Sequence, residues 1–63
     1  EVTAAELYAA IRQLAEPIRE AVLLVVGEGL SHAQAARVLG CAETTVSWRL
    51  FQARRQLRRW LAR

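Results

Sequence analysis

The side chains of this chain that could do chemistry lie near its C-terminal end, and they are arginines and short polar groups. Six arginines and no acidic residue stand from Val46 onwards, whereas the six glutamates all lie before that point. A basic stripe on a nearly neutral body indicates a polyanionic partner, although a solvated arginine-rich helix face would have the same composition.

The remaining reactive groups argue against an enzyme. The chain has no aspartate, one histidine (His32), one cysteine (Cys41) and no glycine-rich phosphate loop. No two groups have the spacing that acid–base or nucleophilic catalysis requires, and His32 has no companion metal ligand. A single thiol forms no internal disulfide, which fits the reducing cytoplasm. We therefore expect no enzymatic activity, no cofactor, no metal and no small-molecule substrate.

Helices must position these groups, because apolar residues recur at helical spacing nearly throughout and strand-like alternation is missing. Thr3 and Glu6 have the spacing of a capping box, which predicts a first helix over about residues 4–14. Pro17 is favourable in the first turn of a helix and disfavours helix at the preceding residue. A second helix is therefore predicted to begin at Glu16 or Pro17.

The second predicted helix is apolar on almost every side. Ile18 and the whole run of residues 21–26 are apolar, and Gly27 and Gly29 then end the helix. In a small domain, such a helix is expected to be the central one, packed on several sides, unless part of its surface meets a partner protein. The run 21–26 is too short to span a bilayer, so no membrane partner is expected.

Two further helices are predicted after this point. Ser31 and Gln34 repeat the capping-box spacing and predict a short helix over residues 32–39, which Gly40 ends as a left-handed cap. A long helix is predicted from Glu43 to about residue 61, because the acid at its start and the arginines at its end both suit the helix dipole. Its expected core stripe is Val46, Leu50, Ala53, Leu57 and Trp60 or Leu61, with Trp60 favoured as a core residue.

A capped short helix, a glycine-containing turn and a longer helix form a helix-turn-helix, in which the second helix enters the major groove of DNA. The predicted fold class is therefore all-α. We expect one four-helix domain over residues 1–63, winged-helix-like without the wing, with the helix-turn-helix over about 31–61 and a long C-terminal recognition helix. Since the chain starts without methionine, we expect a fragment of a longer protein.

Two sets of side chains are the candidate DNA contacts. Those opposite the core stripe are expected to face the groove floor and its donors, acceptors and methyl groups. These base-reading candidates are Thr44, Ser47, Trp48, Phe51 and Gln52. The candidate phosphate contacts are Ser31, His32, Arg37, Thr45, Arg49 and Arg55. Trp48 has three open placements: stacking on sugar-phosphate, filling a partner's groove, or folding back on the domain.

Residues 14–61 resemble region 4 of the extracytoplasmic-function sigma factors, a group of the sigma-70 family. The matching landmarks are Leu14, Pro17, Arg19, Val22–Leu24, Glu28–Ser31, Ala36, Leu39–Gly40, Glu43, Thr45–Val46, Arg49–Leu50, Ala53–Arg54 and Leu57. The resemblance implies a transcription initiation domain that reads the promoter −35 element with its last helix. It also implies docking on the flap of the RNA polymerase β subunit through the first two helices, and inhibition by an anti-sigma factor.

The reading helix departs from the family pattern at three positions. Ser47 and Gln52 are neutral where the family often has a basic residue, and Trp48 stands where a small polar residue is usual. The base preference of a typical member is therefore not carried over. Gln52 can still bond adenine, and Ser47 can bond either base type.

Two alternatives share parts of the pattern. The DNA-binding output domain of a LuxR-type response regulator has similar landmarks at 28–31 and 45–46, but it usually ends in a separate dimerisation helix. The unbroken helical pattern through residues 53–55 favours the sigma factor. The second alternative is a sigma-like decoy that binds only protein, which the neutral Ser47 and Gln52, the Trp48 and the apolar second helix permit.

Overall fold

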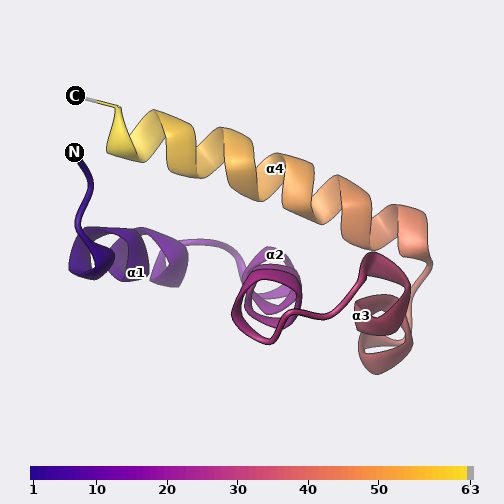
Figure 1. The fold of residues 1–63 in the computed structure, drawn as a ribbon. Coiled ribbons are helices and arrows are strands. Elements are labelled where there is room, and N and C mark those ends of the chain that lie inside the picture. Colours follow the sequence, from indigo (N-terminus) through magenta and orange to yellow (C-terminus); the bar gives the residue numbers. More distant parts are fainter. Residues whose placement is uncertain (63) are drawn as a thin grey trace.

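A computed structural model describes residues 1–62 of the chain, and these residues form helices joined by short turns (Figure 1). The elements are α1 (Ala4–Arg12), α2 (Glu16–Val22), the π-helical turn η1 (Leu23–Gly27), α3 (His32–Leu39) and α4 (Glu43–Leu61). No strand occurs among residues 1–62. The predicted all-α, four-helix architecture with a long last helix is confirmed.

The long helix α4 organises the domain, because it packs against each of the other three α-helices. Figure 1 shows α1, α2 and α3 in a row beside α4, with the start of α1 and the end of α4 at the same end of the molecule. The molecule is correspondingly elongated, with extents of 35 × 18 × 16 Å. The N-terminal part of α4 therefore lies beside α3, and its C-terminal part lies beside α1.

Helix α1 begins with the predicted capping box. The Glu6 amide donates to Thr3 Oγ1 at 3.2 Å, and the Thr3 amide donates to Glu6 Oε1 at 3.0 Å. The helix ends at Arg12, slightly before the predicted end at residue 14, because its last turn tightens and the Leu14 amide bonds the carbonyl oxygen of Ile11 at 3.1 Å. Leu14 is nevertheless buried in the core.

The junction between α1 and α2 is held by Arg19. Its Nη1 donates to the carbonyl oxygen of Leu14 at 3.2 Å, across the turn that leads to Pro17 in the first turn of α2. This bond satisfies a carbonyl group at the end of α1 that has no partner within the helix. Arg19 thus links α2 to the segment that follows α1.

The second predicted helix divides into α2 and η1, where the backbone widens and the Glu28 amide bonds the carbonyl oxygen of Leu23 at 2.9 Å. The expectation that this segment is packed on several sides is wrong for its second half. Leu23 is 43% exposed and Val26 is 72% exposed. The reason is that α3 packs against η1 on one side, whereas an open groove separates η1 from α1 on another. Gly29 follows with φ +75°, a conformation that residues with a side chain rarely adopt.

The core is small and rich in alanine, which lets the helices approach closely. Its buried cluster is Leu14, Ala21, Val22, Ala35, Ala36, Val46, Leu50 and Ala53. Within the predicted stripe of α4, Val46, Leu50 and Ala53 are buried, whereas Leu57 and Leu61 are only half-buried.

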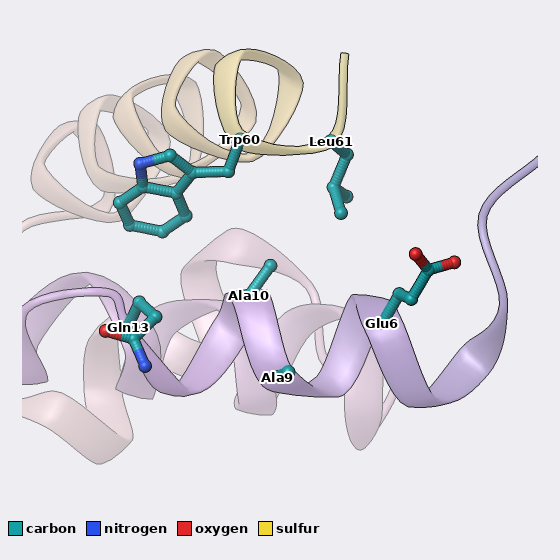
Figure 2. Close-up of a pocket in the computed structure, with 6 residues that line it drawn as sticks. All are labelled: Glu6, Ala9, Ala10, Gln13, Trp60 and Leu61. Atoms are coloured by element: carbon teal, nitrogen blue, oxygen red, sulfur yellow. The ribbon is translucent and has the colours of Figure 1, made fainter. Parts of the chain in front are cut away.

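The expectation that Trp60 belongs to the core is wrong, because its side chain is 44% exposed. Figure 2 shows its indole and the side chain of Leu61 facing α1 across an open groove. The facing residues of α1 include Ala9 and Ala10, whose side chains are too small to cover an indole. The end of α4 therefore packs loosely on α1.

Candidate nucleic-acid interface

The helix-turn-helix is formed by α3, residues 40–42 and α4. Ser31 caps α3 with its Oγ, which accepts the Gln34 amide at 3.1 Å, and Gln34 Oε1 accepts the Ser31 amide at 2.9 Å. Gly40 ends α3 at φ +71°, and the Cys41 amide bonds the carbonyl oxygen of Ala36 at 3.0 Å. Both predicted caps are confirmed, and they determine where the chain turns into α4.

Small side chains set the distance between the two helices of this motif. Ala35 and Ala36 of α3 are buried against α4, where Val46 is fully buried. Close packing of this kind holds the two helices in one relative orientation. The outer face of α4 is therefore presented by a rigid support, as base reading requires.

The five base-reading candidates share the first half of α4. Thr44, Ser47, Trp48 and Phe51 are exposed and Gln52 is half-buried. Trp48 is 56% exposed and Phe51 is 45% exposed, so two large aromatic side chains lie next to each other at the surface of this helix. The structure therefore brings all five candidates to the accessible surface of one helix, and their contacts with bases stay a prediction.

Trp48 stacks on Phe51 and not on the core. The two ring centroids lie 5.4 Å apart with an interplanar angle of 23°. The guanidinium carbon of Arg55 lies 5.9 Å from the centroid of the Phe51 ring, on the next turn of the helix. Of the three placements considered for Trp48, the structure therefore excludes folding back on the domain. Stacking on sugar-phosphate and filling a partner's groove stay open.

His32 and Ser47 join the two helices of the motif. His32 Nδ1 lies 2.8 Å from Ser47 Oγ, and the Ser47 hydroxyl donates to the carbonyl oxygen of Glu43 at 3.3 Å. With that hydroxyl hydrogen used, the bond to His32 is complete when Nδ1 carries the hydrogen and donates it. The pair is separated by 15 positions in sequence. Only the packing of α3 on α4 brings its members together, and sequence reasoning missed the contact.

The phosphate candidates fall into different environments. Ser31 and His32 stand at the start of α3, close to the start of α4, whereas Arg37 is exposed in the last turn of α3. Thr45 is half-buried. Arg49 is also half-buried, and its Nη1 points to Cys41 Sγ at 3.9 Å, in the turn between the helices.

The second half of α4 carries an open row of cations. Arg54, Arg55, Arg58 and Arg59 are exposed, and no acidic residue follows Glu43 in the chain. A shallow groove on this helix is lined by Trp48, Gln52, Arg55, Gln56 and Arg59. Two guanidinium groups beside an indole and two amides form a surface suited to phosphate oxygens and base edges.

Residues 1–62 contain no helix long and apolar enough to cross a membrane. In the same part of the chain, no cluster of three or more histidine, cysteine, aspartate or glutamate side chains could hold a metal ion.

Comparison with known families agrees with this geometry. The sequence matches the family described as "Sigma-70, region 4" over residues 4–57, which is most of the chain and includes α1, α2, α3 and most of α4. The chain belongs to the sigma-70 region 4 family. No match was found among curated proteins, and none among solved structures.

Membership gives this region 4 domain its general function. The family consists of DNA-binding domains of transcription initiation factors, not of enzymes, and it acts in promoter −35 binding together with RNA polymerase. The match does not support the LuxR-type alternative, and α4 runs without a break from Glu43 to Leu61, as expected for a sigma factor.

Proposed function

We propose that this domain reads the −35 element with the first half of α4 and docks on the β flap of RNA polymerase through α1 and α2–η1. One observation carries the DNA part of the proposal. The exposed face of α4 combines aromatic and polar side chains near its start with arginines further along, and packing on α3 holds it rigidly. A recognition helix needs this order of groups, because base edges are read in the groove and phosphates lie on its rims.

The reading residues have distinct roles in this proposal. The Gln52 amide can donate to and accept from adenine, and the Thr44 hydroxyl can bond either base type. Ser47 keeps a lone pair for a base donor, since its hydrogen bonds Glu43. Around them, Ser31, His32, Arg37, Thr45, Arg49 and Arg55 contact the phosphates, with the contribution of Arg49 reduced by its half-buried position beside Cys41.

The docking part of the proposal rests on an apolar groove between α1 and α2–η1. Its lining is Ala4, Leu7, Tyr8, Ile11, Val22, Leu23, Val26 and Gly27. Contiguous exposed apolar surface of this kind marks protein–protein contact, and an amphipathic helix fits a groove between two helices. We assign the β flap as its occupant. The landmark residues of the sequence extend the proposal to the extracytoplasmic-function group and to regulation by an anti-sigma factor. The single thiol, Cys41, extends it to a cytoplasmic location.

An amide NMR titration of the labelled chain at low salt tests the DNA part. A duplex carrying a candidate −35 element should shift the amides from Glu43 to Arg55 more than a scrambled duplex of equal composition does. Binding is expected to be weak, because one small module makes few phosphate contacts. Equal shifts with both duplexes would show only electrostatic binding to that pair. No shifts with either would favour the decoy that binds only protein.

The docking part needs a separate test. Val26→Glu should abolish binding to an isolated β flap segment, because it places a charge in the apolar groove. Val38→Glu is the matched control, since Val38 of α3 is similarly exposed, at 64%, and lies outside the groove. Equal binding by the two variants would remove this surface from the proposal. The Val26→Glu variant should bind DNA as the unchanged chain does, because Val26 lies outside the helix-turn-helix.

A further inference from the structure

The aromatic pair Trp48 and Phe51 is an exposed feature of α4 to which the proposed function has not yet given a role. The two rings stack at 5.4 Å between centroids, and Arg55 packs over the Phe51 ring from the next turn. Such stacking orients both rings and reduces their freedom before any ligand arrives. The pair is therefore an ordered apolar surface on an otherwise polar helix face.

The pair lies on the side of α4 that faces away from the domain. At about 100° per residue, Trp48 stands about 160° around the helix from both Val46 and Leu50. Those two residues are buried, at 0% and 6% exposure. Trp48 is thus among the outermost side chains of the reading face, where a helix in the major groove meets the base pairs.

The chemistry of an indole limits what it can read there. Its ring nitrogen is a donor and it has no acceptor, so Trp48 cannot form the paired bonds by which amides and guanidinium groups recognise purines. The neighbouring Ser47 has its hydroxyl hydrogen bonded to Glu43 and its oxygen close to His32. Hydrogen-bond readout is therefore reduced at this part of the face.

The floor of the major groove offers one apolar group, the 5-methyl group of thymine. We propose that Trp48, supported by Phe51, reads thymine in the bound DNA through contact with this methyl group. The inference rests on the proposed function and adds its base preference. Arg55 and Arg59 line the same groove as Trp48 and supply positive charge for the phosphates, which leaves the indole for the apolar contact.

The test removes or adds single methyl groups on DNA. The 63-residue chain first selects duplexes from a random library at low salt. Each thymine of a selected duplex is then replaced singly by deoxyuridine, which removes only the methyl group, and affinity is measured by fluorescence anisotropy. Replacement at one or two adjacent positions should weaken binding about fourfold each, from the transfer free energy of one buried methyl group.

Variants assign this discrimination to the aromatic pair. Trp48→Ala should bind the thymine and deoxyuridine duplexes equally. Trp60→Ala, which removes a comparably exposed indole from the other end of α4, should discriminate as the unchanged chain does. At the discriminating position, a duplex with 5-methylcytosine should also bind more tightly than one with cytosine. Because Trp48 is exposed, its replacement leaves the core intact, and circular dichroism checks this.

The outcomes separate the inference from the proposed function. The methyl readout is wrong if selected duplexes bind tightly but no replacement of thymine by deoxyuridine weakens binding. It is also wrong if the Trp48→Ala variant prefers thymine over deoxyuridine as strongly as the unchanged chain does. In both cases DNA reading by α4 stands. If no duplex is enriched or bound, the proposed function fails and the inference fails with it.

Discussion

Replacing Val46 by alanine tests the packing on which the whole recognition motif depends. Val46 is the largest side chain among residues 1–62 with 0% exposure. The change removes two buried methyl groups at about 0.8 kcal/mol each, and the unfilled cavity adds to this. We therefore expect the free energy of unfolding to fall by about 2 kcal/mol. A domain of 63 residues has a free energy of unfolding of about 3 to 9 kcal/mol. The variant should therefore lose a large fraction of its stability.

Thermal unfolding followed by circular dichroism measures this loss. At about 4 to 8 °C per kcal/mol for a domain of this size, Val46→Ala should lower Tm by about 8 to 16 °C. Val38→Ala removes the same atoms from an exposed position of α3 and should change Tm little. Equal shifts for the two variants would show that α4 does not pack on α3 through this face, and the assignment of its opposite face to DNA would then be lost.

Three further predictions concern the turn, the contact between α3 and α4, and the basic row. Gly40→Ala should destabilise the domain by about 1 kcal/mol because Gly40 has a left-handed φ. Gly27→Ala should not, since Gly27 has neither a positive φ nor a crowded Cβ position, and denaturant melts with equal midpoints for the two variants would contradict this. A double-mutant cycle of His32→Ala and Ser47→Ala should give a coupling of about 0.5 to 1 kcal/mol, and additive losses would mean that their hydrogen bond contributes nothing. Arg55→Ala should weaken binding to all duplexes alike and reduce the slope of log affinity against log salt by about one, so an unchanged slope would exclude a phosphate contact.

Local signals predicted the helices closely because each boundary depends on residues near it in the chain. Thr3 with Glu6, and Ser31 with Gln34, form the capping boxes that their spacing predicts. Gly40 adopts the left-handed conformation expected of a helix end. Caps, prolines and glycines act over a few residues, so the sequence contains the whole interaction.

Burial was predicted less well, because it depends on which elements cover a surface. The apolar run 21–26 indicates a central helix, yet Val26 is 72% exposed, because an open groove lies between η1 and α1 on that side. Trp60 has the helical phase of a core residue, but the α1 residues that face it are too small to cover it. The widening of the backbone at η1 had no signal in the sequence that we could identify.

For the candidate site, the sequence by itself determined which side chains share the outer face of α4, since helical spacing and the buried positions of Val46 and Leu50 decide this. It also determined the basic row and the family landmarks. Only the tertiary structure decided what these side chains contact. His32 meets Ser47 because α3 packs on α4. Trp48 and Phe51 are neighbours three residues apart on α4, and the tertiary structure decided only that both rings stay exposed. Contacts between helices depend on distance and orientation in space, which the spacing of residues along one helix does not contain.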